Sequence, residues 1–191
     1  PTDIYTPSCA RRINAYKLCG FRDMSDSQLD KEMAFREAFR HDDDLVAVIR
    51  GHLYIEAQAN RLIEGLLPHP KEIGKSKLGW PQRVELSLAL GLKKQYGPPL
   101  KKLGKIRNKF AHRPDAMLEE NDVKELYQCL HENDQDIVLQ SYEKTRDQAS
   151  NPSQKDFCSL DYKDQFTLMV MAIHAMLRVA VSEATGESIT T

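Results

Sequence analysis

The stretch from residue 45 to residue 67, LVAVIRGHLYIEAQANRLIEGLL, constrains the fold more than any other part of the chain. Its apolar residues recur at the spacing of one face of an α-helix and do not alternate as they would in a strand. They are Leu45, Val48, Ile49, Ile55, Leu62, Ile63 and Leu66. Three aspartates at 42–44 precede the stretch, where carboxylates can cap the first turn and meet the positive end of the helix dipole. The sequence therefore predicts one long helix with its apolar face in a core.

Other segments carry helical signals of the same kind. Further helices are predicted at residues 25–40, 81–92, 98–111 and 123–133, with a last one from about 161 to 183. Pro81 and the pair at 98–99 stand where prolines commonly begin helices. Residues 67–80 are predicted to form a loop, and 143–160 a long surface connection. Only DIVLQSY at 136–142 comes near a strand pattern, and it is short. The chain is therefore predicted to be all-α.

The length of 191 residues suits a single domain with a sizeable core. We expect an N-terminal arm at residues 1–24, where apolar and polar residues show no clear period. A single helical bundle of about five to six helices is expected over residues 25–185. Residues 186–191 are expected to form a frayed tail.

Composition excludes several functional classes. The formal net charge is -1, which gives no overall attraction to nucleic acid or membrane, so an anion site must be local. The four cysteines are scattered and form no disulfide framework or zinc motif, which predicts a reduced, cytoplasmic protein without metal or cofactor. The apolar run at 166–181 is interrupted by charged residues and falls short of a bilayer span. No apolar signal segment follows the basic residues among the first 20.

The stretch KIRNKFAHRP, residues 105–114, gathers residues that can do chemistry at the end of a predicted helix. On a regular helix Arg107 and His112 lie about 140° apart, but a helix ending at Ala111 leaves His112 free to turn back. Pro114 favours such an ending. An arginine, Asn108 and a histidine together suit a phosphodiester, since they supply a fixed cation, a polar positioner and a proton-transfer group. An ordinary helix terminus with a basic cap is the alternative.

The motif IRNKFAH resembles the R-x4-6-H motif of the HEPN superfamily. The preceding GWPQRVELSLALGLKKQYGPPLKKLGK is similar in layout to the mannitol-repressor-like branch, in which a helix ending in ALGL leads into the motif helix. The long helix at 45–67 also looks like the early helix of that branch, with Gly51 and Glu56 at matching places. The resemblance covers roughly residues 44–130, and leaves out the arm before residue 25 and the segment 132–160.

The resemblance implies a helical homodimer in which two motif copies face each other, and a metal-independent endoribonuclease in active members. Arg107 would stabilise the phosphate charge, Asn108 would position the phosphate, and His112 would transfer protons while the RNA 2'-hydroxyl attacks phosphorus. RNA and a second copy are thus the expected partners, with a protein antitoxin or regulator if the chain is a toxin or defence component. The alternative is a non-enzymatic regulator or interaction module of the mannitol-repressor type.

Supporting residues are predicted around this motif. Glu56, and His52 one turn before it, could orient the motif side chains, although a Glu on a long helix is commonly solvated or ion-paired. Lys105, Lys109 and Arg113 add positive charge that could guide an RNA backbone, or could simply form a solvated helix face. The histidine at 174 lies within an apolar helix and is expected to be a core residue.

Overall fold

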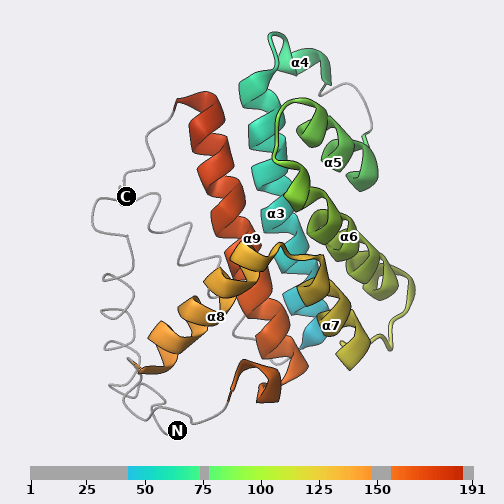
Figure 1. Cartoon of the computed structure of the whole chain (residues 1–191). Helices are drawn as coiled ribbons and strands as arrows, with labels where there is room; N and C mark the ends of the chain where they lie inside the picture. The colour runs from blue at the N-terminus through green and yellow to red at the C-terminus, as the bar shows by residue number, and fades with distance from the viewer. Residues whose placement is uncertain (1–42, 74–77, 148–155, 187–191) are drawn as a thin grey trace, which may run out of the picture.

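The computed structural model describes residues 43–73, 78–147 and 156–186. Over these residues the chain is all-helical without strands, so the predicted all-α class is confirmed (Figure 1). The elements are α3 (Asp44–Leu66), α4 (Pro70–Ile73), α5 (Trp80–Ala89), η1 (Lys94–Tyr96), α6 (Gly97–His112), α7 (Glu120–Cys129), α8 (Glu132–Asp147), η2 (Phe157–Ser159) and α9 (Tyr162–Thr185). The predicted arm, the first predicted helix and all of the predicted tail except Gly186 lie outside the described residues.

The centre of the bundle is the pair α3 and α9, which pack side by side over much of their length (Figure 1). The helices α5 and α6 cover α3, α7 contacts both α6 and α9, and α8 packs across α9. Fully buried side chains from these helices form one core. The largest of them are Phe166, Ile55, Leu62, Leu100, Leu103, Ile106, Leu126, Met169, Ile173 and Leu177.

Local signals in the sequence set most of the helix ends. The Asp43 carboxylate accepts a hydrogen bond of 2.8 Å from the Leu45 N–H, which caps α3 as predicted. Prolines occupy the first turn of α6, where the missing N–H is not needed. Gly91 has a φ of 115° and turns the chain after α5, while Gly186, with a φ of 67°, ends α9.

Three segments differ from the sequence prediction, and one of them is the short helix α4 inside the loop predicted at 67–80. Residues 132–147 form α8, although 143–160 was expected to be a surface connection and 136–142 was the nearest approach to a strand. The predicted helix at 123–133 is two helices, because Leu130 has an extended backbone that separates α7 from α8. Val138 is buried in the common core, so tertiary packing stabilises a segment with few apolar residues of its own.

The helix α9 is long enough and apolar enough to cross a membrane by length and composition, and among the described residues it is the single helix of this kind. With 24 residues, α9 is longer than the apolar run at 166–181, which by itself falls short of a bilayer span. Half of its most apolar stretch is buried inside the bundle, mainly against α3. A core helix in a bundle meets the same criteria, so length and composition are weak evidence for a membrane span.

Candidate functional site

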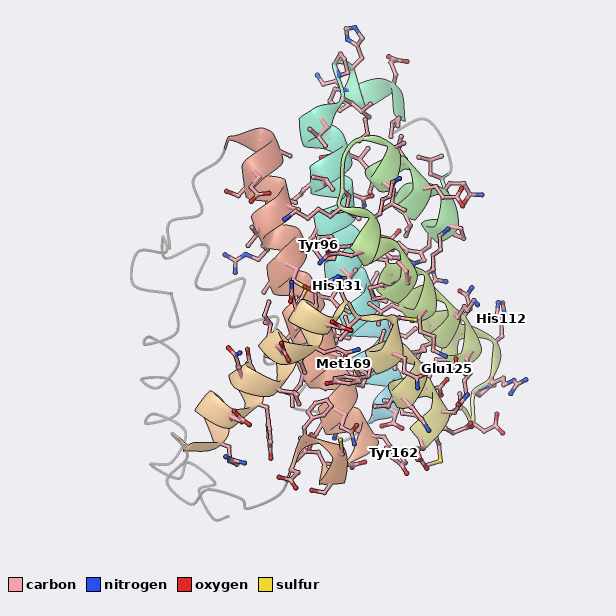
Figure 2. The ribbon with its side chains drawn as sticks, in the orientation of Figure 1. Tyr96, His112, Glu125, His131, Tyr162 and Met169 are labelled. Atoms are coloured by element: carbon pink, nitrogen blue, oxygen red, sulfur yellow. The ribbon has the colours of Figure 1, made fainter. Side chains whose placement is uncertain are left out.

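The motif residues lie on the C-terminal half of α6, which the buried Ile106 and Phe110 fix to the core. The helix includes His112 as its last residue, and the extended backbone of Arg113 ends it. Because the helix stays regular, Arg107 and His112 project about 140° apart. His112 is exposed and points away from the bundle (Figure 2), whereas Arg107 is partly buried. No hydrogen bond joins these two described side chains within one copy of the chain.

Asn108 lies beside Arg107 and contacts it directly. The Nη1 atom of Arg107 donates a hydrogen bond of 2.9 Å to the Oδ1 atom of Asn108. Asn108 is exposed, so its amide can also meet a ligand from solvent. The structure thus brings together two of the three predicted catalytic residues, and leaves the third on another face of the same helix end.

A histidine on α3, His52, is buried and is affected by the charge of Arg107. His52 is 2% exposed, and its ring meets Trp80 edge-on with the ring centroids 4.6 Å apart. Burial, assisted by the positive charge of Arg107, lowers the pKa of His52 to about 4. His52 is therefore neutral near pH 7, and its role in orienting the motif side chains stays a prediction.

The carboxylate of Glu56 connects His52 to α5. Its Oε2 atom lies 3.8 Å from the Nδ1 atom of His52, and its Oε1 atom lies 3.3 Å from the Nε atom of Arg83. Arg83 also donates to the backbone oxygen of Leu78 at 3.1 Å and to the side-chain oxygen of Asn60. Glu56 is thus an ion-paired group within a polar cluster that joins α3 and α5.

The part played by α5 carries no signal in the sequence, because neither Arg83 nor Trp80 belongs to a motif. The indole N–H of Trp80 donates a hydrogen bond of 2.8 Å to the Leu100 backbone oxygen on α6. A Cβ atom at Gly104 would lie 2.2 Å from the Trp80 ring, so only glycine allows this approach. The close contact between Trp80 on α5 and Gly104 on α6 depends on how the two helices pack, and the sequence alone does not indicate it.

The opposite side of α6 faces α7 and is filled with ion pairs. The ammonium of Lys109 lies 2.7 Å from an Asp122 carboxylate oxygen and 2.9 Å from one of Glu119. Desolvation works to lower the pKa of Lys109, but these hydrogen bonds outweigh it and raise that pKa. Lys102 is paired in the same way, at 2.6 Å from a Glu125 oxygen. The predicted RNA-binding residue Lys109 therefore has its charge engaged by acidic groups of its own chain.

The other two predicted RNA-binding residues, Lys105 and Arg113, are exposed. The buried His174 on α9 confirms its predicted place in the core, where its Nε2 lies 3.1 Å from the Nε2 atom of Gln58. Across residues 43–73, 78–147 and 156–186, no three His, Cys, Asp or Glu side chains form a cluster suited to a metal ion.

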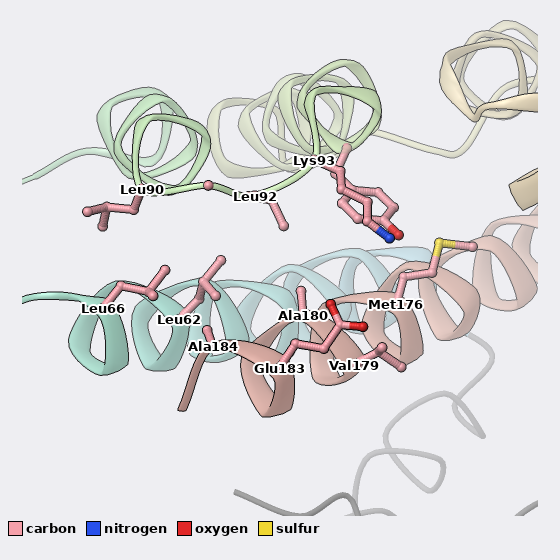
Figure 3. A pocket seen from close by; sticks show the side chains of 12 residues that line it. Leu62, Leu66, Leu90, Leu92, Lys93, Met176, Val179, Ala180, Glu183 and Ala184 are labelled. Atoms are coloured by element: carbon pink, nitrogen blue, oxygen red, sulfur yellow. The ribbon is translucent and has the colours of Figure 1, made fainter. Parts of the chain in front are cut away.

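A separate hollow lies between the C-terminal halves of α3 and α9 and the turn that follows α5 (Figure 3). Its volume is about 240 Å³, and its walls are mainly apolar, with Lys93 and Glu183 among the lining side chains. None of the predicted motif residues lines it. It is therefore distinct from the cluster around Arg107.

Comparison with known proteins does not connect this arrangement to a characterised site. No protein-family model matches the chain, and no curated protein or solved structure matches it either. The HEPN resemblance stays a prediction that rests on the motif and its layout.

Proposed function

We propose that this chain is a metal-independent endoribonuclease of the HEPN type, active as a homodimer. One observation carries the proposal: Arg107 is partly buried beside Asn108, while His112 is exposed on another face of the same helix end. A single copy holds the cation and the imidazole on different sides, so they do not converge on one phosphate. A twofold interface repeats the same patch on both copies, and can therefore bring Arg107 opposite His112 of the partner subunit.

In the proposed reaction the 2'-hydroxyl of the RNA attacks the adjacent phosphorus and loses its proton to one imidazole. The bond from phosphorus to the 5'-oxygen breaks, and an imidazolium gives that oxygen a proton. The products are a cyclic phosphate and a 5'-hydroxyl. Arg107 stabilises the negative charge that develops on the phosphorane, and Asn108 positions the phosphate oxygens. We further propose a cytoplasmic protein that serves as a toxin or defence component, with a protein antitoxin as its regulator.

Purified protein incubated with transfer RNA and messenger RNA in EDTA tests the reaction. Cleavage that leaves cyclic-phosphate ends supports the proposal. Arg107→Ala and His112→Ala should each fold and dimerise but lose cleavage by about 100-fold or more, because each removes a group that acts on the transition state. Lys101→Ala, an exposed change on the same helix, is the matched control and should cleave normally.

Mixing the two inactive variants tests the shared site. After subunit exchange, a heterodimer has one composite site with an intact arginine and an intact histidine, so cleavage should return in part. Mass spectrometry must confirm the heterodimers. Confirmed heterodimers that stay as inactive as their parents would contradict a site shared across the dimer.

A non-enzymatic interaction module is the second candidate, and the exposed apolar side chains favour it. Leu53 is 57% exposed and Met117 is 68% exposed. Isolated apolar residues are common on surfaces, but such side chains are also typical of sites that bind another protein. RNA that stays intact with wild-type protein, together with single variants indistinguishable from wild type in every RNA assay, would favour this reading.

A further inference from the structure

The hollow between α3, α9 and the turn after α5 has an apolar interior (Figure 3). The side chains of Leu62, Leu92 and Met176 line it, and each of them is at most 8% exposed. The volume of about 240 Å³ is a little below the range of about 300–1,000 Å³ that is typical of pockets for drug-sized ligands. The hollow therefore suits the apolar part of a smaller molecule.

Hydrogen bonds fix the wall of the hollow that follows α5. Gly91, with a φ of 115°, turns the chain, and the Leu92 N–H donates a hydrogen bond of 2.9 Å to the Ser87 backbone oxygen. The side chain of Gln95 joins the same segment to α8 through a hydrogen bond of 3.0 Å to Asp134. Because this wall is already ordered, a ligand that binds against it does not have to order the chain first.

Two side chains of opposite charge lie on facing walls of the hollow. Figure 3 shows Lys93 on the segment after α5 and Glu183 on α9, and both side chains reach toward the space between the walls. Both are exposed. Neither forms an ion pair with the other or with any further residue among 43–73, 78–147 and 156–186. Both charges are therefore available to a ligand.

Tyr96 adds a hydrogen-bond donor on the same segment as Lys93. It lines the hollow, and its hydroxyl has no hydrogen-bond partner among the residues that the structure describes. Burial raises the pKa of Tyr96, and the charges of Asp134 and Glu183 raise it further, so the hydroxyl keeps its proton near pH 7. An ammonium and a phenol on one wall suit a carboxylate, whereas the carboxylate of Glu183 on the other wall suits an ammonium.

We propose that this hollow binds a free amino acid with an apolar side chain, such as leucine, methionine or phenylalanine. The apolar side chain of the ligand lies between α3 and α9, its carboxylate contacts Lys93 and Tyr96, and its ammonium contacts Glu183. A fatty acid would leave Glu183 without a cation, and an apolar amine would leave Lys93 without an anion, so a molecule with both charges fits best. The site is independent of the proposed RNA cleavage, since no motif residue lines it.

Isothermal titration calorimetry of the full-length wild-type protein tests the site, with L-leucine, L-methionine and L-phenylalanine as probes. At least one of them should bind, and L-alanine should bind about tenfold more weakly, because its methyl group fills little of the hollow. Two derivatives of the tightest binder follow. Its amide lacks the carboxylate and its N-acetyl form lacks the ammonium, so each should bind about tenfold more weakly than the amino acid itself.

Variants that remove one charge identify which end of the ligand each residue contacts. Lys93→Gln should weaken binding of the amino acid about tenfold but leave the affinity for the amide unchanged, because the amide has no carboxylate to lose a partner. Glu183→Gln should likewise weaken the amino acid and leave the N-acetyl form unchanged. Lys94→Gln is the matched control, since it removes an exposed charge from the next residue, which does not line the hollow, and should bind as wild type does.

Filling the hollow gives a second test that does not depend on charge. Ala180 lines the hollow, so Ala180→Phe should abolish binding by occupying the space. Ala175→Phe is the matched control, because Ala175 is exposed on the same helix and does not line the hollow. Circular dichroism checks that the variants fold. If Ala180→Phe does not fold, the charge variants and the derivatives decide.

Each contrary outcome overturns the proposal in its own way. If none of the three amino acids binds, the hollow is not an amino-acid site. An amide or N-acetyl form that binds as tightly as the amino acid shows that only apolar groups are recognised. Binding that survives in Ala180→Phe and in both charge variants places the ligand elsewhere. An absence of binding, together with an oligomeric state that Ala180→Phe alters in analytical ultracentrifugation, identifies the hollow as a contact between copies of this chain.

Discussion

The two sides of α6 carry similar positive charges and use them in opposite ways. On the side that faces α7, Lys102 and Lys109 are held by carboxylates at 2.6 to 2.9 Å. On another side, Arg107 donates a hydrogen bond to Asn108, and its charge helps to keep the buried His52 neutral. The first side fastens two helices together, whereas the second side keeps a cation that forms no ion pair with a carboxylate among residues 43–73, 78–147 and 156–186.

The difference shows that a basic helix is not uniformly a binding surface. A lysine whose ammonium is bonded to two carboxylates offers little attraction to a phosphate, because the local charge is already balanced. An arginine next to a neutral amide and a neutral imidazole keeps its full charge. Anion binding is therefore expected on one side of α6 and stabilisation of the fold on the other.

The largest effect is expected from Phe110→Ala, because this buried side chain fixes the part of α6 that carries both sides. Phe110 is 3% exposed and packs between the two sides of α6. Phe110→Ala should lower the free energy of unfolding by about 3 to 5 kcal/mol through the cavity it leaves. Urea denaturation followed by circular dichroism measures this. A loss of stability below about 1 kcal/mol would mean that the core does not fix the end of α6. Because Phe110→Ala is expected to be strongly destabilised, it is unsuitable for testing catalysis.

Lowering the pH should reduce stability mainly through the buried histidines, and less through the ion pairs between α6 and α7. Burial, aided by Arg107, lowers the folded pKa of His52 to about 4, and burial, aided by Arg178, lowers that of His174 to about 3. The unfolded chain binds these protons near pH 6.5, so stability falls as pH drops below 6.5. At pH 5 each histidine should cost on the order of 2 kcal/mol relative to pH 7.

On the α7 side, the hydrogen bond from Lys102 lowers the pKa of Glu125, so this ion pair contributes little to that decline. The free energy of unfolding measured in urea at pH 7, 6 and 5 gives the slope. His52→Phe and His174→Phe should each remove about half of it. An unchanged slope in His52→Phe would show that His52 is not held neutral in the folded protein.

Replacing the cation of the other side of α6 tests whether its geometry matters beyond its charge. Arg107→Lys keeps the charge but loses the fork of donors, and should reduce RNA cleavage by about tenfold or more. Stability should stay within about 0.5 kcal/mol of wild type, because Arg107 contributes no core contact comparable to Phe110. Initial cleavage rates at saturating RNA provide the measurement. Full activity in the lysine variant would mean that any positive charge suffices at this position.

Removing a lysine from the α7 side should have the reverse effect. Lys109→Ala leaves the Asp122 and Glu119 carboxylates without their shared cation, and should lower the free energy of unfolding by about 1 kcal/mol. RNA cleavage should stay near the wild-type rate. Lys105→Ala on the exposed part of the same helix is the control, and should leave stability unchanged. A large loss of cleavage in Lys109→Ala at normal stability would contradict the division between the two sides.

The smallest expected effect concerns the exposed Lys105. If it contacts an RNA phosphate, Lys105→Ala should weaken RNA binding about twofold and reduce the slope of log affinity against log salt by about 0.7. Lys109→Ala should leave that slope unchanged. Fluorescence anisotropy with a non-cleavable oligonucleotide at several salt concentrations distinguishes the two variants. Equal slopes in Lys105→Ala and wild type would remove Lys105 from the binding surface.

The sequence by itself determined the helical class, the long helix α3, and the core positions Ile106 and Phe110 on α6. These features depend on interactions between residues three or four positions apart and on caps next to them, which a single segment encodes. The same reasoning did not predict α8, because that segment has few apolar residues and its helix depends on packing against α9.

Only the tertiary structure decided how the charged and polar groups of the motif region are used. Lys105 and Lys109 look equivalent in the sequence, but Lys109 is partly buried with an Asp122 carboxylate oxygen at 2.7 Å, whereas Lys105 is exposed. His52 becomes neutral near pH 7 only when the fold buries it against Trp80 and brings the charge of Arg107 to bear on it. Desolvation and charge pairing depend on which helix surfaces come into contact. The packing of the helices determines those contacts, and the sequence of one helix does not.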